Sequence, residues 1–255
     1  MEKMNFDFSG KTVVITGGTK GIGRAIALAF GQSHANVVVA GRRQEDCDQV
    51  AADIKALGGS AAGIRTDVRN LSELEALIRG TVECFGGVDV LVNCAGVAVT
   101  KKILDLDEKD YDMVMETNLR SVLFASKAAA AEMKDSGKGG KIIQIASVGG
   151  LKGTSGLSLY GASKAAVINL TKTMALEWSR YGIQTNAVCP GYVVTEINKS
   201  QFDDEKFRER VVKTIPQRRL GTVNEVAAIV LFLASDASGM INGEAIVADM
   251  GAICG

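Results

Sequence analysis

The sequence predicts a single-domain, doubly wound α/β fold, with a parallel sheet of about seven strands and helices on both faces. Short apolar runs of strand length recur along the 255 residues, and most are separated by longer stretches with the 3.6-residue periodicity of helices. The runs are apolar throughout rather than alternating, which is typical of parallel strands buried on both faces. Because 47% of the residues are hydrophobic and no linker or repeat interrupts the chain, residues 1–255 are expected to form one core.

Strands and helices are expected to alternate along the chain. Strand-length apolar runs occupy residues 12–16, 37–40, 62–66, 88–92, 141–146, 184–188 and 245–248. Helical periodicity between them is clearest at residues 22–30, 44–57, 71–85, 160–181 and 223–234. In such a fold, ligands bind beyond the carboxyl ends of the strands. The one long stretch without a clear period, 191–222, is expected to be a mobile substrate lid with a short helix at residues 205–213.

Charge and cysteine content exclude several classes of protein. Lysine plus arginine equals aspartate plus glutamate, at 29 each, so there is no net charge to attract nucleic acid or an anionic membrane. The five cysteines are scattered and never form a C-x-x-C pair, which argues against a disulfide framework and a zinc site. Residues 1–10 are too polar for a signal peptide, and no uncharged apolar run approaches the roughly 18 residues of a membrane span. We expect a cytoplasmic protein without nucleic-acid, membrane or metal partners.

A glycine-rich turn at residues 16–23 follows the first strand and leads directly into the first helix. Gly17 and Gly21 let the backbone approach a pyrophosphate, the helix N-terminus offers unpaired N–H groups, and Gly23 permits close helix–strand packing. A turn in this context predicts a Rossmann-type dinucleotide site. The residues of the turn expected to bind the cofactor are Gly17, Thr19, Lys20, Gly21 and Ile22.

The end of the second strand indicates which dinucleotide binds. NAD-preferring folds usually place an acidic residue there, roughly 20 residues beyond the glycine turn, to bind the adenosine ribose hydroxyl. Here the sequence is Gly41-Arg42-Arg43, without an acid. Two guanidinium groups suit a 2′-phosphate and Lys20 supplies a third cation, so NADP(H) is the expected cofactor. The alternative is that Arg42 and Arg43 simply solvate a loop.

Few residues can act as the acid of a hydride-transfer reaction. Reduction of a carbonyl needs a group that protonates the forming alkoxide, and histidine is the commonest choice. The one histidine, His34, lies at the end of the first expected helix, where capping or exposure explains it better. No carboxylate stands beside it and no metal-ligand cluster appears, so zinc-assisted alcohol oxidation is disfavoured. Tyr160 and Lys164 remain, one helical turn apart on the same helix face.

Tyr160, Lys164 and Ser147 are expected to carry the chemistry together. A free tyrosine titrates near 10, so acting near neutrality requires a fall of roughly three pKa units, or about 4 kcal/mol. One ammonium about 4 Å away, at an effective dielectric constant of roughly 20, supplies about that much, so Lys164 is expected to lower the pKa of Tyr160. Ser147 directly follows a strand, where its hydroxyl can donate to a substrate oxygen. The alternative is that Tyr160 and Lys164 only pack against the core.

Several motifs, in order along almost the whole chain, resemble those of the compact form of the short-chain dehydrogenase/reductase family. They are the glycine turn at 16–23, Asp67, Asn93-Cys94-Ala95-Gly96, Asn118, Ser147, Tyr160 with Lys164, and the segment 186–191. Each motif alone is weak, but the ordered set is specific. The resemblance implies an NADP-dependent oxidoreductase acting on CH–OH groups, with Tyr160 as the acid/base and Ser147 polarising the substrate oxygen.

The resemblance also implies roles for individual residues. Those implied to contact the cofactor are Asp67 and Val68 at adenine, Asn93, Ala95 and Gly96 at the adenosine ribose, Lys164 at the nicotinamide ribose, and Pro190, Gly191, Val193 and Thr195 at the nicotinamide. Asn118 would hold a water in a proton relay behind Lys164. Lys20 and Arg42 occupy positions that mark NADP users. Family members are commonly tetramers that pair the helices carrying Asn118 and Tyr160, so a homotetramer is expected.

Two positions depart from the family's pattern. Cys94 replaces the second asparagine of the usual Asn-Asn-Ala-Gly, a small-residue change that need not make the thiol reactive. Met250 replaces a glycine of the usual C-terminal Asp-Gly-Gly, a change expected to affect packing near a subunit contact. Neither departure touches the chemistry.

Mostly small or apolar residues are expected to face the substrate, namely those at 97–100 and 149–159, Tyr192, and the lid at 197–207. The chain is similar to 3-oxoacyl-carrier reductases and to reductases of sugars, polyols and small cyclic ketones. Carrier-protein reductases tend to place a basic residue just before the acidic residue of the catalytic helix, but here Leu176 precedes Glu177. A small ketone, ketose or polyol is therefore favoured over a carrier-protein or CoA thioester. A non-enzymatic NADP(H)-binding protein and an epimerase or dehydratase remain alternatives.

Overall fold

The computed structural model, which describes residues 6–195 and 198–254, contains one seven-stranded sheet in which all paired strands are parallel. The strands are β1 (Thr12–Thr16), β2 (Asn36–Gly41), β3 (Ser60–Arg65), β4 (Val90–Asn93), β5 (Gly140–Ile145), β6 (Ile183–Pro190) and β7 (Ala245–Ala248). Their order in the sheet is β3-β2-β1-β4-β5-β6-β7. The predicted doubly wound, Rossmann-type fold is confirmed. Its topological switch point lies between β1 and β4, where such folds bind ligands.

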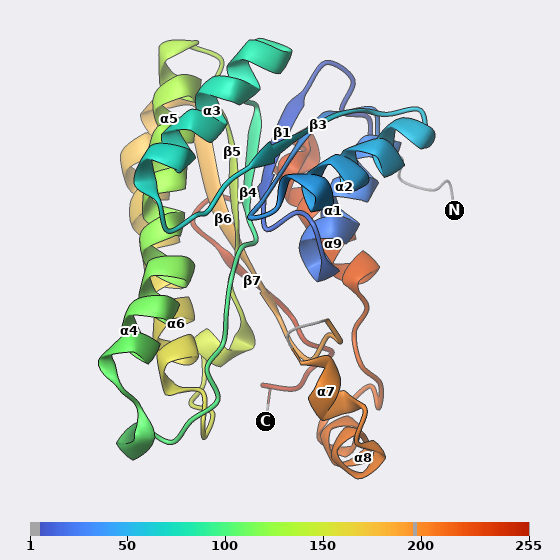
Figure 1. The fold of residues 1–255 in the computed structure, drawn as a ribbon, viewed down its shortest axis with the longest axis vertical. Coiled ribbons are helices and arrows are strands. Elements are labelled where there is room, and N and C mark those ends of the chain that lie inside the picture. Colours follow the sequence, from blue (N-terminus) through green and yellow to red (C-terminus); the bar gives the residue numbers. More distant parts are fainter. Residues whose placement is uncertain (1–5, 196–197, 255) are drawn as a thin grey trace.

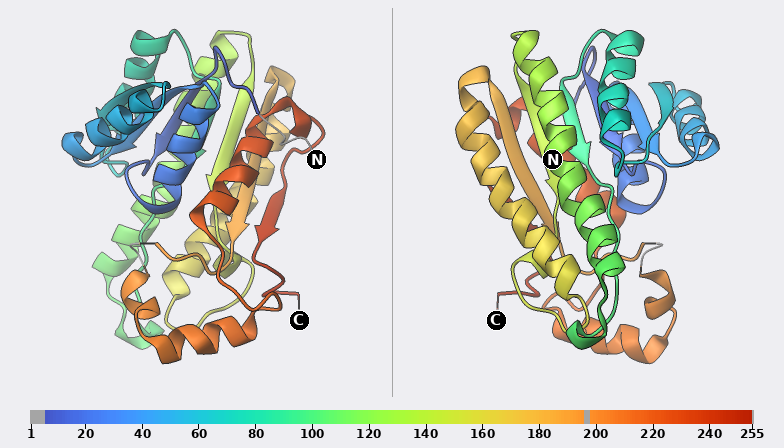
Figure 2. Two further views of the ribbon diagram at one scale, coloured as in Figure 1. Left: turned by 90° about the vertical axis from the view of Figure 1, so that its right-hand side faces the viewer. Right: turned by 60° about the vertical axis from the view of Figure 1, so that its left-hand side comes forward.

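Helices cover both faces of the sheet. On one face lie α1 (Gly21–Gln32), α2 (Gln44–Ala56) and α9 (Val223–Ala234), and on the other α3 (Leu71–Phe85), α5 (Ser121–Asp135) and α6 (Ser158–Trp178) (Figure 1). Helix α4 (Glu108–Met115) continues through a π-helical turn, Glu116–Arg120, into α5. Two short helices, α7 (Lys199–Phe202) and α8 (Glu205–Thr214), lie apart from both layers, beyond the carboxyl ends of the strands (Figure 2).

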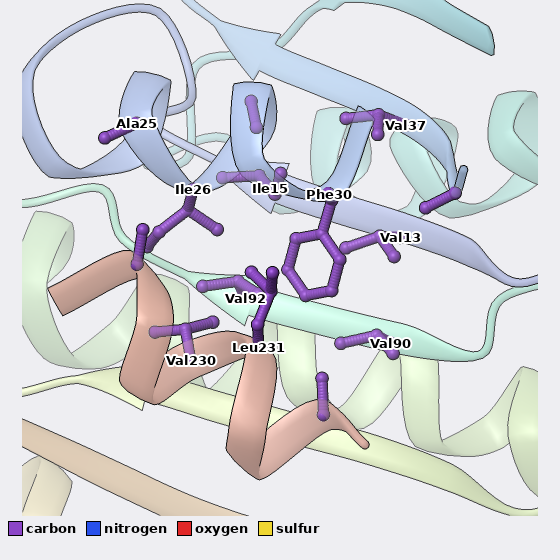
Figure 3. Packing of buried hydrophobic residues seen from close by; sticks show 14 of the residues in the cluster. Val13, Ile15, Ala25, Ile26, Phe30, Val37, Val90, Val92, Val230 and Leu231 are labelled. Carbon is purple, nitrogen blue, oxygen red and sulfur yellow. The ribbon is translucent and has the colours of Figure 1, made fainter. Parts of the chain in front are cut away.

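The packing of α1 and α9 on the sheet forms the larger core (Figure 3). Phe30 of α1 packs near Val13 of β1 and Leu231 of α9, and all three are buried. Burying such a side chain stabilises the fold by roughly 1.5–3 kcal/mol. Positions along β1 alternate between the two faces, since Val13 and Ile15 belong to this core while Val14 packs in the cluster under α3 and α5. Both faces are apolar, which explains the continuous apolar runs in the sequence.

Residues 108–135 form the long helical region that periodicity did not indicate. Helix α5 is rich in alanine, and its buried face includes Ala125, Ala129 and Ala130. Alanine favours a helix but contrasts little with the exposed face, so the apolar stripe is weak although helix propensity is high. The helix expected at 160–181 begins two residues earlier, at Ser158, and ends in a 3₁₀ turn at Ser179–Tyr181.

The segment 191–222 packs around a small apolar cluster of its own. The rings of Tyr192 and Phe207 stand edge-on to Phe202, with ring centres 6.2 and 5.4 Å away. Helix α8 confirms the short helix expected at 205–213, and α7 adds a second. Residues 196 and 197 of the predicted lid, like residues 1–5, lie outside the described residues. No helix in the described part of the chain is long and apolar enough to span a membrane.

Candidate active site

A cavity of about 430 Å³ lies at the carboxyl ends of the strands. Most residues predicted to bind the cofactor or act in catalysis line it: Gly17, Thr19, Lys20, Gly21, Ile22, Arg42, Asp67, Val68, Ala95, Gly96, Ser147, Tyr160, Lys164, Pro190, Gly191, Val193 and Thr195. Arg43, Asn93 and Asn118 are not among the lining residues. The fold thus brings together residues that are up to 181 positions apart in the sequence, from Gly17 to Asn198.

The glycine turn brings the backbone close to neighbouring segments. Gly17 has φ +66°, and a Cβ there would lie 2.7 Å from the Cα of Ala95. A Cβ on Gly23 would lie 2.2 Å from the carbonyl oxygen of Gly17. Helix α1 has Lys20 as its N-cap, without a side-chain cap, and no acidic residue in its first turn. The first N–H groups of α1, which belong to residues lining the cavity, are therefore available to an anion.

Of the three cations expected at the 2′-phosphate, Lys20 and Arg42 line the cavity and Arg43 does not. The Arg43 guanidinium is held instead by Asp46 in the first turn of α2, with Nε donating to Oδ2 at 2.8 Å. A nearby carboxylate thus competes successfully for this side chain. Gly41, before the two arginines, lies against Thr19, whose Cγ2 would be 2.7 Å from a Cβ at Gly41. The turn after β2 and the glycine turn are therefore in contact.

The turn after β3 closes the same side of the cavity. The Thr66 N–H donates to the Gly41 carbonyl at 2.7 Å, so the turns after β2 and β3 lie side by side. Asp67 accepts a hydrogen bond from the Arg69 guanidinium, with Nη2 and Oδ2 3.1 Å apart. That bond, with a smaller contribution from the charge of Arg42, holds the pKa of the Asp67 carboxyl below its usual range. Asp67 is therefore ionised at neutral pH.

The turns after β2 and β3 lie at one side of the cavity. Ser147, Tyr160 and Lys164 line the other side, across β1 and β4 from these turns. The Ser147 Oγ accepts a hydrogen bond from the Gly149 N–H at 3.0 Å, which orients the hydroxyl. Tyr160 lies in the first turn of α6, with its phenol near the Ser147 hydroxyl. Lys164 is buried, and its Nζ donates to the Ile145 carbonyl at 2.8 Å and lies 5.7 Å from the centre of the Tyr160 ring. Strand β5 and helix α6 hold the three side chains together.

Burial shifts the pKa values of Tyr160 and Lys164 in opposite directions. Desolvation raises the pKa of Tyr160, and the neighbouring Ser147 hydroxyl offsets this only in part. Desolvation lowers the pKa of Lys164 to about 8. The expected lowering of the tyrosine pKa is therefore not found in this structure, because the Lys164 ammonium bonds to the Ile145 carbonyl and burial of the phenol dominates. Tyr160 is protonated at neutral pH and can donate a proton.

Asn118 supports the cavity wall rather than lining it. It lies in the π-helical turn between α4 and α5, an irregularity frequently found at functional sites. Its Oδ1 accepts from the Val97 N–H at 2.8 Å, and its Nδ2 donates to the Val97 carbonyl at 2.9 Å and to the Ser163 Oγ at 3.1 Å. These bonds fix the loop after β4 to helix α6, beside Lys164. The water-holding role implied for Asn118 stays a prediction.

Asn93 is likewise buried beneath the cavity. Its Nδ2 donates to the Ser126 Oγ at 3.0 Å and to the Gln144 Oε1 at 2.8 Å, which ties the end of β4 to α5 and β5. The next residue, Cys94, does line the cavity, and burial raises the pKa of its thiol to about 12. Cys94 is therefore a neutral, weakly nucleophilic thiol at pH 7.

Val97 and Asn198, from two segments expected to face the substrate, also line the cavity. Sequence reasoning missed a further group of lining residues, most of them next to a motif: Gly41, Thr66, Arg69, Met113, Thr117, Ile145 and Ala146. Met113 comes from α4, where no motif signalled it, and Thr117 precedes the motif residue Asn118 in the π-helical turn. His34 lies in the turn between α1 and β2 with φ +66° and does not line the cavity. Within residues 6–195 and 198–254, no cluster of three or more His, Cys, Asp or Glu side chains is arranged to hold a metal ion.

Comparison with known proteins gives consistent matches over nearly the full length. A family model described as enoyl-(acyl carrier protein) reductase matches residues 17–252. The chain is 37% identical to L-rhamnose 1-dehydrogenase (NAD(P)(+)) of Azotobacter vinelandii, over 94% of this chain and 96% of that protein. It is 36% identical to 2-dehydro-3-deoxy-D-gluconate 5-dehydrogenase of Escherichia coli, over 96% of both chains. It is 35% identical to gluconate 5-dehydrogenase of Gluconobacter oxydans, also over 96% of both.

Solved structures agree with these matches. The crystal structure of a short-chain type dehydrogenase/reductase from Mycobacterium marinum superposes with a TM-score of 0.93. That protein is 37% identical to this chain, and the match covers 98% of each. The likeness therefore extends over the whole sheet, both helical layers and the segment that follows β6.

Proposed function

Because the chain belongs to the short-chain dehydrogenase/reductase family, we propose that it transfers a hydride between NADP(H) and a ketone or secondary alcohol of a small sugar, sugar acid or polyol. The relatives are dehydrogenases, so oxidoreductase activity is shared. The proposal rests on one observation: Ser147, Tyr160 and Lys164 line the same cavity as the glycine turn. Helix α1, which follows this turn, has no side-chain cap at its N-terminus. A bound nicotinamide cofactor supplies or accepts the hydride there.

Tyr160 is the proton donor of the proposed reduction. Its phenol, kept neutral by burial, protonates the substrate oxygen as the carbonyl is reduced. The Ser147 Oγ already accepts a bond from the Gly149 N–H, so its own O–H proton can be donated to the same substrate oxygen. Oxidation of an alcohol requires the phenolate of Tyr160, and because burial raises the pKa of the phenol, this direction is favoured by alkaline pH.

NADP(H) is proposed over NAD(H) on the charges at the cavity. Lys20 and Arg42 line it, and within the described residues no carboxylate forms an ion pair with either. Both cations therefore remain available for a 2′-phosphate. No acid follows β2 at the position that would bind a ribose hydroxyl, since the residue after Gly41 is Arg42.

A small polyhydroxylated substrate is supported by the relatives, which are named for rhamnose, 2-dehydro-3-deoxygluconate and gluconate. The alternative is a 3-oxoacyl thioester of a carrier protein or CoA, which the description of the family model favours. Leu176 argues against a carrier-protein substrate. Its side chain on α6 is 84% exposed, so an apolar group occupies the position where carrier-protein reductases tend to place a cation. Lys141, at the start of β5, bonds to Gln184 and is partly buried.

A homotetramer that pairs the helices carrying Asn118 and Tyr160 is a further part of the proposal. Exposed apolar side chains on those helices, Leu123 and Leu176, support it. The five unpaired cysteines support a reducing, cytoplasmic location. Light scattering of the purified protein should give the mass of four chains, and a monomer at micromolar concentration would contradict the assembly.

The function is tested by NADPH oxidation over a panel of ketoses, keto-sugar acids, cyclic ketones and 3-oxoacyl thioesters. Turnover is expected with at least one polyhydroxylated ketone. Tyr160→Phe should lower that rate by about 10²–10⁴-fold. Tyr181→Phe, in the 3₁₀ turn after α6 and away from the cavity, is the matched control and should retain it. Turnover confined to thioesters would select the alternative substrate, and NADPH binding without turnover across the panel would refute the proposed reaction.

A further inference from the structure

Arg69 lies in the part of the cavity that would hold the adenosine half of the proposed cofactor. It lines the cavity next to Asp67, in the turn after β3, which is joined to the turn after β2 by the 2.7 Å bond from the Thr66 N–H to the Gly41 carbonyl. The 2′-phosphate proposed to meet Arg42 is carried by the same ribose as the adenine. A purine on that ribose therefore falls beside the turn that holds Arg69. This step rests on the proposed function.

The Asp67 carboxylate bonds to one edge of the planar Arg69 guanidinium. Nη2 donates to the Asp67 Oδ2 at 3.1 Å and Nε donates to the Oδ1 at 3.3 Å, while the Arg69 backbone N–H also donates to Oδ1 at 3.1 Å. A two-point contact of this kind fixes the plane of the guanidinium and leaves its faces free. The side chain is 45% exposed, so the faces are accessible.

Arg69 and Arg42 differ in how far their positive charge is compensated by neighbouring carboxylates. The positive charge of Arg69 is compensated by Asp67 and, at longer range, by Glu116 in the π-helical turn. Arg42 forms no ion pair within the described residues. A phosphate would gain little from an already neutralised guanidinium, whereas a flat neutral base is attracted to its face by stacking and cation–π interaction.

We infer that Arg69 is an adenine-binding residue, whose guanidinium face stacks on the purine of the bound cofactor, and that Asp67 is the positioning residue that sets the plane of the guanidinium. Arg42 and Lys20 then serve the phosphate and Arg69 serves the base. Because the base is common to NADPH and NADH, Arg69 contributes equally to the binding of both.

The test compares dissociation constants of NADPH, NADH and reduced nicotinamide mononucleotide, which lacks adenosine, by titrating the nicotinamide fluorescence. Arg69→Ala should weaken NADPH and NADH equally, by about ten-fold, or about 1.4 kcal/mol. It should leave binding of the mononucleotide unchanged. Arg69→Lys keeps the charge but lacks the planar face, so it should not restore affinity. Arg65→Ala removes an arginine that pairs with Glu73 outside the cavity and should change none of the three constants.

The stacking role of Arg69 and the proposed function are contradicted by different results. A loss confined to NADPH, a rescue by Arg69→Lys, or unchanged affinity in Arg69→Ala would each overturn the stacking role, while wild-type binding and turnover would leave the proposed function intact. A wild-type protein that binds neither dinucleotide would overturn both. Thermal melts of Arg69→Ala and Arg65→Ala verify that the variants are folded before their affinities are compared.

Discussion

Replacing Lys164 with methionine should change how the stability of the fold depends on pH. Lys164 is 5% exposed, and burial lowers its pKa from 10.5 to about 8. A shift of roughly two to three pKa units corresponds to about 3 kcal/mol. Between these two pKa values the unfolded chain binds more protons at this residue than the folded chain, so the contribution of Lys164 to the free energy of unfolding rises with pH. Below pH 8 both states are protonated and the contribution is constant.

Methionine has a similar length and does not titrate, so the Lys164→Met variant lacks this rise. The free energy of unfolding of the wild type, relative to the variant, should increase by about 3 kcal/mol between pH 7 and about pH 10.5. Urea denaturation at fixed protein concentration, followed by the fluorescence of Trp178, measures both proteins across this range. Because the other titrating groups are present in both proteins, their contributions largely cancel in the difference.

The matched control is Lys172→Met, which alters an exposed lysine on the same helix and should give a curve parallel to that of the wild type. If the Lys164→Met curve is also parallel to the wild-type curve, Lys164 is not desolvated in the folded protein. That result would also refute the conclusion that α6 carries a buried cation whose charge destabilises the fold.

Three further results are expected from the cavity. Arg42→Ala should weaken NADPH binding by about 100-fold and leave NADH binding nearly unchanged, whereas Arg43→Ala should affect neither in fluorescence titrations. Because burial raises the pKa of Tyr160 above its usual range, ketone reduction should keep its rate through the pH range in which a free tyrosine titrates, and alcohol oxidation should accelerate with pH through that range; the opposite pH profiles would contradict this. Gly23→Ala should lower the free energy of unfolding by about 1–3 kcal/mol because its methyl group would lie 2.2 Å from the Gly17 carbonyl oxygen, and an unchanged melting temperature would argue otherwise.

The strands of the sheet were predictable because they appear in the sequence as short, local apolar runs. β1 and β7 match the expected ranges, and the glycine turn lies between β1 and α1 as the motif requires. Helix α5 was not indicated, since its buried alanines contrast too little with the rest of its surface to give a periodic signal.

The membership of the cavity was also largely predictable, whereas its hydrogen bonds and charges were not. Asn118 bonds to Ser163, 45 residues further along the chain, and Asn93 bonds to Gln144, 51 residues further on. No motif marks Gln144, and Ser163 lies within the Tyr160–Lys164 motif without having been given a role. The direction of the Tyr160 pKa depends on how deeply the fold buries the phenol, a quantity that helical spacing to Lys164 does not contain.

Hydride transfer is tested most directly by following deuterium from NADPH that carries the label at both C4 positions of the nicotinamide. With a ketone that the protein turns over, we expect the label on the carbinol carbon of the alcohol product and a hydroxyl proton that comes from solvent. Tyr160→Phe should bind the labelled cofactor but transfer little deuterium. An alcohol product without carbon-bound deuterium, or undiminished transfer by Tyr160→Phe, would contradict the proposed reaction.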